Sequence, residues 1–551
     1  MKLDKAVLGI LLLAFMPVAV QMLVGYGGHD FRQHVASWME LRDLWRAGQF
    51  HPGWAPRAAF TLGDARFLYY PPVPFTVGTG LAMLLPFSAV PAAYVWLTFA
   101  LSGLAMYFAC RDFVAVQDRW KAAVLYMASP YLLTTSLVRF AAAEVLTLVW
   151  LPLILLYFYR AVWLGSRRAT MLLGCLLGLT WITNVPASIV LLYALSFTVC
   201  VIAILQRSLR PLIVPFFAEC IAGALAAFYI VPVLLEQSWI QRDANLRDRL
   251  DNYFLSFSTA KLPLVYYGVG LWIIIVVSTV LVCLLAWAGR KRAALADAQQ
   301  AQNEQVEREQ VRTWLALVLV CFFFQLPISA VLWWHLPELR FADFPYRFLA
   351  PLGGAVPLMV LAKGTPKRWR MAGYVVLGLL ALIPLREYRA SKGALINFNA
   401  TIPMWEQIGY RAWPEFVPAG AARPEEPVHI VPVSVEDPAA NPHCTVELTG
   451  AYAGQKTLVT ETDEPCRIRV AQFFFPYWRA IDDSGIPLPI SKDSRGLLLI
   501  SAPTGRHTVH LYFRASSQAR TASLIASAVC LVMVLLTIYI PRRVSFSPRS
   551  R

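Results

Sequence analysis

An acidic residue stands where the first apolar run of this chain ends. The segment Gly25-Tyr-Gly-Gly-His-Asp-Phe-Arg-Gln-His34 places Asp30 a few residues beyond that run. A carboxylate at such a boundary can accept a proton from a hydroxyl group and act as a general base. The alternative is structural, because residues 35–46 have helical spacing and Asp30 can be the N-cap of that segment. Both interpretations of Asp30 are open at this point.

Charged side chains also stand at two later boundaries. Arg139-Phe-Ala-Ala-Ala-Glu144 is a short turn between apolar runs, where its acid and base either serve chemistry or form a structural ion pair. Arg347, in Phe344-Pro-Tyr-Arg-Phe348, can hold a phosphate with its planar guanidinium group or extend to lipid headgroups. His29 and His34 are candidate ligands or bases, although histidines in a wet loop are usually neither.

The composition predicts a membrane protein. Of 551 residues, 58% are hydrophobic and 15% are charged, whereas soluble domains are about a quarter charged. The net charge of +16 is scattered between apolar stretches, which argues against nucleic-acid binding. No CxxC or HExxH metal spacing, P-loop or GxGxxG motif occurs, so we expect neither a cofactor nor a bound metal; a divalent ion has no support from the sequence.

Apolar runs of spanning length predict about 12 transmembrane helices. The first follows Met1 to Lys5 and lacks an A-x-A cleavage site, so we expect an uncleaved anchor. An additional apolar segment, 73–88, is bracketed by prolines, and we expect a short helix there that does not cross. The predicted spans are 6–24, 92–109, 121–137, 143–159, 169–183, 186–205, 211–235, 264–288, 313–333, 345–362, 371–385 and 521–540.

The positions of the basic residues predict the orientation. With 73–88 outside, the inner loops and both termini hold 23 Lys and Arg against 7 Asp and Glu, and the remaining chain holds 26 of each kind. This is the positive-inside pattern, and it places both termini in the cytoplasm. We expect a transmembrane module at 1–385 with a first outer loop at 25–91, and a last helix with a basic cytoplasmic tail at 521–551. Residues 236–263 form another outer loop, and 289–312 a solvated inner helical extension.

Residues 386–520 predict a β-rich outer domain. Alternations such as His507-Thr-Val-His-Leu-Tyr-Phe513 and the spacing of Pro and Gly favour strands and a sandwich-like module. Cys444 and Cys466 lie in this polar region, whereas the other seven cysteines lie in or beside apolar runs. In an oxidising periplasm we expect Cys444 and Cys466 to form a disulfide; two buried thiols on separate strands are the alternative.

Several motifs resemble a bacterial family of multipass proteins labelled 6-pyruvoyl-tetrahydropterin-synthase-related. The resemblance covers most of the chain and implies no pterin chemistry. The family architecture is similar to the GT-C glycosyltransferases. The sequence departs from the family pattern at Arg139-Phe140, where Arg-Gly is usual, and at Pro476-Tyr-Trp478, where a PGW-like motif is usual. The motifs are Gly28-His-Asp30, Leu68-Tyr-Tyr-Pro-Pro72, Ser129-Pro-Tyr131, Arg139 to Glu144, Ala227-Phe-Tyr-Ile-Val-Pro232 with Glu236, Phe344-Pro-Tyr-Arg347, and Phe473 to Trp478 through Gly505 to Val509.

The resemblance implies an inverting membrane glycosyltransferase in the bacterial inner membrane. Its donor would be a polyprenyl-phosphate-linked sugar, its acceptor an envelope glycan, lipid or protein, and membrane lipids would surround it. Asp30 matches the family's acidic residue near the reaction centre. On this basis Asp30 and Glu144 are expected to be catalytic, and the expected substrate-binding residues are His29, Tyr70, Arg139 and Arg347. The competing classes are a transporter or flippase for a lipid-linked glycan, and a non-catalytic assembly subunit.

Overall fold

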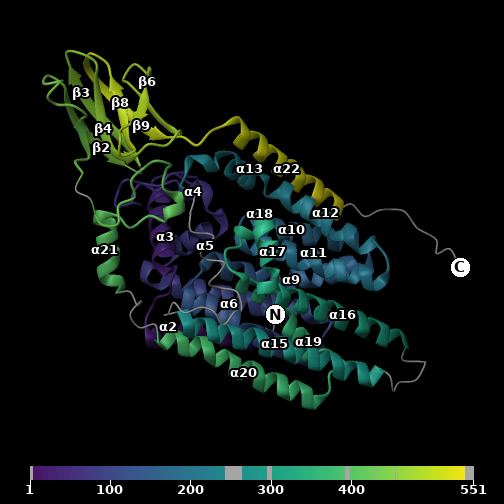
Figure 1. Cartoon of the computed structure of the whole chain (residues 1–551). Helices are drawn as coiled ribbons and strands as arrows, with labels where there is room; N and C mark the ends of the chain where they lie inside the picture. Colours follow the sequence, from purple (N-terminus) through teal and green to yellow (C-terminus); the bar gives the residue numbers. More distant parts are fainter. Residues whose placement is uncertain are drawn as a thin grey trace.

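The computed structural model describes residues 4–241, 264–293, 301–390, 397–427, 430–452 and 454–539. The outer loop predicted at 236–263 therefore lies mostly outside the described residues, as do the basic tail beyond residue 539 and the middle of the predicted inner extension. A helical body makes up most of the chain, and a β-rich module lies at one end of it (Figure 1). The structure confirms a mainly helical fold with a β-rich C-terminal part, whereas the number of spans and the outer location of the β domain stay predictions.

Each of the twelve predicted spans is mainly helical. Among the described residues, six helices are long and apolar enough to cross a membrane, or up to eight if each of two bent pairs is one span. The count of twelve therefore stays a prediction. The helices in the predicted spans are α1 (Lys5–Leu13), α2 (Met16–Val24), α6 (Val90–Ala109), α7 (Arg119–Met127), α8 (Pro130–Leu133), α9 (Ala142–Leu164), α10 (Arg167–Trp181), α11 (Val185–Gln206), α12 (Arg210–Leu225), α13 (Ala227–Glu236), α15 (Leu264–Ala293), α16 (Ala301–Phe323), α17 (Ala330–His335), α19 (Leu349–Val360), α20 (Lys367–Ala390) and α22 (Gln518–Tyr539).

Breaks in the helices explain why fewer long helices than apolar runs are found. The chain bends by 75° between α12 and α13 and by 81° between α16 and the segment that contains α17. Helix α7 ends shortly before Pro130, which lacks a backbone N–H group and begins the short helix α8. A six-residue π-helix, Thr134–Arg139, follows α8 and leads into α9.

The segment predicted not to cross is the short helix α5 (Pro72–Leu84). Its 13 residues reach about 20 Å, less than the roughly 30 Å of a bilayer core. It packs on α3 (Phe31–Arg46) so closely that a Cβ atom added at Gly78 would lie 2.1 Å from the indole of Trp38. The helical segment predicted after Asp30 is therefore α3, and α5 lies against it as part of the first loop.

The β-rich module contains two antiparallel sheets. One has the order β1-β4-β8-β7 and the other β2-β3-β9-β5-β6. Apolar side chains of both sheets, such as Val470 and Leu498 in one and Leu458 and Val509 in the other, share one buried core. The strands are β1 (Val433–Val435), β2 (Thr445–Tyr452), β3 (Gln455–Thr462), β4 (Cys466–Phe473), β5 (Trp478–Ile481), β6 (Pro487–Leu488), β7 (Ile490–Lys492), β8 (Leu497–Ala502) and β9 (Gly505–Phe513).

The disulfide in the structure connects these two sheets. Cys444 immediately precedes β2 and Cys466 begins β4, and their sulfur atoms are bonded. Strands β2 and β3 form a hairpin between the two cysteines. Leu448 pairs with Leu458 in this hairpin, and the register shifts between Leu448 and Gly450. The hairpin brings the two cysteines near each other, and the bond ties one sheet to the other.

The first loop is packed into the β module. Trp54, Leu62 and Leu68 belong to the same buried core as the strands. The indole N–H of Trp54 donates to the side-chain oxygen of Gln472 at 2.7 Å, and the N–H of Phe473 donates to the carbonyl of Leu62 at 2.7 Å. Helix α22 then returns along α13 and α12 (Figure 1). The first loop, the β module and the last helix therefore share contacts instead of forming separate units.

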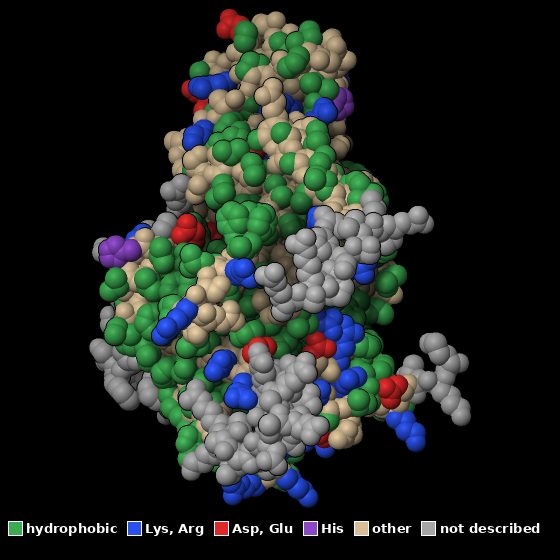
Figure 2. Space-filling model, turned by 90° about the vertical axis from the view of Figure 1, so that its right-hand side faces the viewer, with side chains coloured by type: hydrophobic (Ala, Val, Ile, Leu, Met, Phe, Trp, Pro, Cys, Tyr) green, Lys and Arg blue, Asp and Glu red, His purple; other side chains and the backbone are tan. Residues whose placement is uncertain are grey.

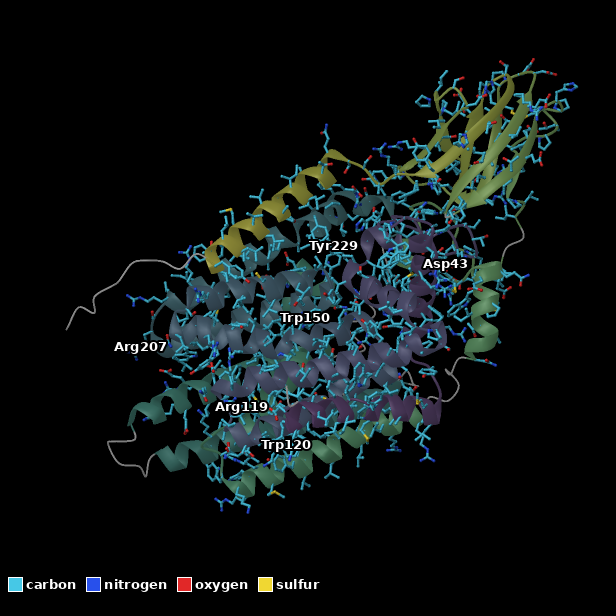
Figure 3. All side chains as sticks on the ribbon, turned by 180° about the vertical axis from the view of Figure 1, so that it is seen from behind. Asp43, Arg119, Trp120, Trp150, Arg207 and Tyr229 are labelled. Atoms are coloured by element: carbon cyan, nitrogen blue, oxygen red, sulfur yellow. A yellow bond between two sulfur atoms is a disulfide. The ribbon has the colours of Figure 1, made fainter. Side chains whose placement is uncertain are left out.

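The two ends of the helical body differ in character. Asp43, in α3, lies on the side of the β module, whereas Arg207, at the end of α11, lies at the opposite end (Figure 3). On the face shown in Figure 2, Lys and Arg side chains gather toward the end away from the β module. The site described below lies on the α3 side, where α2 ends and α9 begins.

Candidate functional site

Glycines position the loop that carries Asp30. Gly28 has φ +129°, and a Cβ atom there would lie 2.7 Å from Cβ of Phe140 and 3.0 Å from the carbonyl oxygen of Arg139. Any larger residue would push the loop away from the Arg139 turn. The close approach lets the backbone N–H of Asp30 donate to the Arg139 carbonyl at 2.8 Å. Asp30 is thus held at Arg139 by the backbone as well as by charge.

The Arg139 turn has an unusual backbone. The π-helix ends at Arg139, and Phe140 adopts a left-handed conformation with φ +51° before α9 begins at Ala142. This is a conformation that glycine adopts without strain, so the turn has the shape that glycine would favour although phenylalanine occupies the position. The buried ring of Phe140 packs on Phe31, with centroids 4.6 Å apart, and on Trp38. These contacts hold the turn in place.

Glu144 is the centre of a buried group of charges. Its carboxylate accepts a hydrogen bond from Nη1 of Arg139 at 2.7 Å and one from the hydroxyl of Tyr131. Nε of Arg347 lies 3.5 Å from the same carboxylate. The guanidinium of Arg347 also donates to the carbonyl of Ala342 at 2.5 Å and pairs with Asp343 at 3.1 Å. Glu144 therefore fixes both arginines in one place.

Asp30 is the more accessible carboxylate of the group. Its side chain is 22% exposed, against 3% for Glu144. One oxygen lies 2.7 Å from Nδ1 of His29 and the other 3.7 Å from Nη2 of Arg139. Burial opposes ionisation, but the bond to His29 and the charge of Arg139 lower the pKa of Asp30 to about 2. Asp30 is therefore ionised at neutral pH.

Asp30 has the position of an N-cap but not its hydrogen bond. Asp30 occupies the N-cap position of α3, but its side chain makes no capping hydrogen bond. The carboxylate instead faces His29 and Arg139. The position of Asp30 begins the helix, and its charged group is directed to the site.

An aromatic wall lies beside the charged group. Tyr70 stacks on Trp413 with centroids 5.1 Å apart and on Phe75 at 4.7 Å. Burial raises the pKa of Tyr70 well above its usual value. His34 meets Tyr70 edge-on and is 1% exposed, and burial lowers its pKa to about 4, so the ring is neutral at pH 7. Tyr70 belongs to this wall, and the ion pairs of the site do not include it.

The structure thus brings five of the predicted residues into one cluster and sets Tyr70 beside them. Asp30, His29, Arg139, Glu144 and Arg347 are connected by contacts of 3.7 Å or less. Tyr131 and Tyr346 belong to sequence motifs named above, but no role was predicted for their side chains. Tyr131 donates to Glu144, and the ring of Tyr346 lies 5.6 Å from the Arg139 guanidinium carbon. In the sequence, the only mark of these two tyrosines is that each directly follows a proline in its motif.

The inner side of the cluster is closed. A crevice of about 10 Å³ lies beside Glu144 and Arg347 between α9 and α11. Such a space holds no sugar or phosphate. His29 and Asp30 are therefore the exposed members of the cluster, whereas Glu144 and Arg347 line the closed crevice. Arg139, whose side chain is 11% exposed, lies between them.

Two other polar positions have structural roles. The side chain of Asn184 accepts from the N–H of Ala187 at 2.8 Å and caps α11. Arg340 donates to the carbonyl of Trp334 at 2.5 Å. Within the described part of the chain, one group of three possible metal ligands was found, Asp482, Asp483 and His507 in the β module. Asp482 is buried, Asp483 is exposed and His507 belongs to β9. Asp482 already accepts from backbone N–H groups of its own turn.

A comparison with solved structures matches two transferases at low scores. The arabinofuranosyltransferase AftD from Mycobacteria matches 73% of this chain at 18% identity, with a TM-score of 0.42 over 27% of its own length. The oligosaccharyltransferase of Archaeoglobus fulgidus, in its apo form, matches 77% at 12% identity with a TM-score of 0.40 over 61% of its length. The chain thus spans about a quarter of the first and about three fifths of the second. No curated protein matches its sequence.

A family model gives the stronger result. The model described as the 6-pyruvoyl-tetrahydropterin synthase related domain, a membrane protein, matches residues 67–386. The match covers more than half of the chain and includes Arg139, Glu144 and Arg347. It begins after Asp30 and ends before the β strands. The chain belongs to the 6-pyruvoyl-tetrahydropterin synthase related family of membrane proteins.

Proposed function

We propose that this protein is a membrane glycosyltransferase that moves a sugar from a polyprenyl-phosphate donor to an acceptor at the outer face of the bacterial inner membrane. The observation that carries the proposal is the ionised, partly exposed carboxylate of Asp30 beside the guanidinium of Arg139. This pair lies where helices of membrane-spanning length and composition, α1 with α2 and α9, end or begin. A lipid-anchored phosphate presents its sugar at such a boundary.

The chemistry needs a base for the acceptor and a cation for the leaving phosphate. In the proposed step, the acceptor oxygen bonds to the anomeric carbon as the bond from that carbon to the phosphate oxygen breaks. The acceptor proton passes to Asp30, and the electron pair of the broken bond stays on the phosphate, which Arg139 holds. A single displacement of this kind inverts the anomeric centre.

The charges of the site couple these two roles. Asp30, Glu144 and Asp343 outnumber Arg139 and Arg347, so the cluster without substrate has no excess positive charge. The donor phosphate must therefore compete with Asp30 for Arg139, and the separation of 3.7 Å makes Asp30 the weaker of the two partners of Arg139. Loss of this ion pair would raise the pKa of Asp30 and make it a stronger base. Donor binding thus prepares the base.

The other residues of the cluster position these two. Glu144 orients Arg139 through their bond of 2.7 Å. Arg347 donates hydrogen bonds to Ala342 and Asp343 and forms an ion pair with Glu144 at the closed crevice, so we assign it to holding Glu144 in place of the direct phosphate contact expected from the sequence. His29, whose side chain is 86% exposed, contacts Asp30 from the open side and is placed to meet substrate. Tyr70 contributes to the wall beside the site.

The proposed orientation follows the positive-inside pattern. Both termini lie in the cytoplasm, and twelve spans carry the module at 1–385. The β-rich domain at 386–520 is periplasmic, and 521–551 returns to the cytoplasm. With this orientation Asp30 and the β module are on the same, outer side.

The experiment that tests the function is chemical analysis of a deletion strain. Envelope glycans and lipid-linked sugars are measured in cells complemented with wild-type protein or with Asp30→Asn. A transferase with Asp30 as base predicts a shortened glycan and an accumulated polyprenyl-linked donor in both the deletion and the Asp30→Asn strain. If Asp30→Asn restores the wild-type pattern, the protein is an assembly subunit or acts without this base. Donor accumulated only on the cytoplasmic leaflet would identify a flippase.

A further inference from the structure

A second pocket lies between the first loop and the β module, at the other end of α3 from Asp30. It has a volume of about 250 Å³ and is lined by Gln49, His51, Trp54, Gln455 and Phe513 among others. Helix α3 begins at Phe31, next to Asp30, and ends at Arg46, so its 16 residues are about 24 Å long. None of the residues that line the pocket belongs to the charged cluster. The pocket is therefore distinct from the proposed reaction centre.

The floor of the pocket is aromatic and firmly held. The ring of Phe513 stacks on Trp54 with centroids 5.3 Å apart and meets Trp478 edge-on at 5.3 Å. Trp54 is fixed by its bond to Gln472. A Cβ atom at Gly53 would lie 2.8 Å from the Phe513 ring, so glycine at this position lets the loop close onto the ring. The half-buried ring of Phe513 offers a fixed apolar surface to a ligand.

The rim of the pocket carries two amide side chains and one imidazole. The side chains of Gln49, His51 and Gln455 make no hydrogen bond to any other described residue. An amide both donates and accepts hydrogen bonds, as does a neutral imidazole. The described lining residues include no Lys, Arg, Asp or Glu. Such a rim matches hydroxyl groups, which also donate and accept, better than it matches phosphate, carboxylate or ammonium groups.

We propose that this pocket binds a neutral sugar residue of a glycan. A sugar ring has apolar C–H faces that pack on an aromatic ring and a rim of hydroxyl groups that bond to amides. A site of this kind, with an apolar floor and a few placed polar groups, is typical of small-ligand recognition. This assignment rests on the proposed transferase function: because the pocket lies beyond the other end of α3 from Asp30, it would bind a distal part of a polymeric acceptor.

Binding to the purified full-length protein tests the proposal directly. The probes are neutral heptasaccharides of glucose, mannose, galactose and arabinose, with a heptamer of galacturonic acid as the charged control, titrated by saturation-transfer-difference NMR. We expect at least one neutral heptasaccharide to bind wild-type protein. The double variant Gln49→Ala/Gln455→Ala should weaken that binding by about twentyfold or more, because two amide hydrogen bonds are lost. Gln407→Ala, at an exposed glutamine of α21 (Phe398–Ile408), is the matched control and should bind normally.

The outcomes separate the pocket from the reaction centre. Asp30→Asn should bind the heptasaccharide as wild type does, whether or not it transfers sugar, so loss of activity and loss of binding are independent results. Absence of binding by all four neutral probes, unchanged affinity in the double variant, or equal affinity for the galacturonic acid heptamer would each overturn the proposal. Should the double variant unfold at a lower temperature than Gln407→Ala, the single variant Gln455→Ser takes its place. Its expected loss of affinity is about fivefold, because one amide hydrogen bond is lost, and unchanged affinity would overturn the proposal.

Discussion

The backbone N–H of Asp30 donates to the carbonyl oxygen of Arg139 at 2.8 Å, and their side-chain charges face each other at 3.7 Å. The whole first loop and three helices separate these residues along the chain. Gly28 makes the contact possible, because a side chain there would collide with the Arg139 turn. The relative positions of the proposed base and the proposed phosphate ligand are therefore fixed by one backbone hydrogen bond.

Substitution of the two arginines by lysine should have different effects. Arg139 contacts Glu144 through Nη1 and Asp30 through Nη2, and a lysine cannot make both contacts. We expect Arg139→Lys to lower kcat/KM for the lipid-phosphate donor about tenfold or more. Arg347→Lys should chiefly lower the thermal midpoint, because its contacts are buried. Steady-state kinetics and thermal unfolding of both variants check this, and a normal kcat/KM in Arg139→Lys would contradict the assignment.

A buried acid in the first loop should make stability depend on pH. Glu40 is 1% exposed, accepts from the backbone N–H of Arg57 at 2.5 Å and from the hydroxyl of Tyr410, and burial raises its pKa to about 7. The folded state then holds a proton that the unfolded state has released above its ordinary pKa of 4.5. The stabilising effect is complete below pH 4.5 and is lost as the pH rises through 7. We expect Glu40→Gln, which carries no charge, to gain thermal stability over wild type as pH increases from 5 to 8.

A thermal midpoint difference that stays constant across this range would show that Glu40 does not titrate there. Glu406→Gln serves as the control, because Glu406 is an exposed acid on α21. Its effect on the midpoint should not change with pH over the same interval.

The disulfide between the sheets should stabilise the β module. Cys444 and Cys466 enclose a loop with a sequence separation of 22, and closing such a loop is worth roughly 3 kcal/mol. We expect the double variant Cys444→Ser/Cys466→Ser to unfold at a lower temperature than wild-type protein. Reductant should lower the unfolding temperature of wild-type protein in the same way. Thiol labelling of unreduced, unfolded protein gives the second readout. Modification of both residues in that assay would mean that the bond is absent from the mature protein.

The orientation is checked with reporter fusions. Because the inner loops and termini hold 23 basic and 7 acidic residues, fusions after Arg119 and after Arg167 should both report cytoplasm. Either fusion reporting periplasm would place residues 73–88 across the membrane and reverse the proposed sides. A fusion within the β module, after Gly485, should report periplasm.

The charged cluster could be predicted from the sequence because charged groups at the ends of apolar segments must find partners. Asp30, Arg139, Glu144 and Arg347 all met this condition, and the structure places them in contact. Phe140 stands where the family pattern has glycine, and its backbone has the left-handed conformation that glycine favours. A buried ring packed on Phe31 accompanies this conformation.

Other features depend on contacts that a linear pattern does not contain. The packing of Trp54 on Phe513 joins residues from opposite halves of the chain. Nothing in the sequence around either residue indicates that it contacts the other. The wall formed by Tyr70 and Trp413 has the same origin. Burial of Arg347 was also not predictable, since its depth is set by Asp343 and Ala342 folding back over its guanidinium group. The role that we propose for Arg347 is therefore support for Glu144, whereas the sequence predicted a phosphate ligand.

The central claim is tested most directly by sugar transfer in Asp30→Asn. Asparagine preserves the shape of the side chain, and the Asp30 side chain makes no capping hydrogen bond that could be lost, so the variant should fold and insert normally. It cannot accept the proton of the acceptor hydroxyl, and loss of a general base typically costs about a hundredfold or more. With purified protein, polyprenyl-phosphate-linked donor and native acceptor, we predict that Asp30→Asn binds donor but transfers sugar at one hundredth of the wild-type rate or less. Transfer at the wild-type rate by normally folded Asp30→Asn would contradict the proposed role of Asp30.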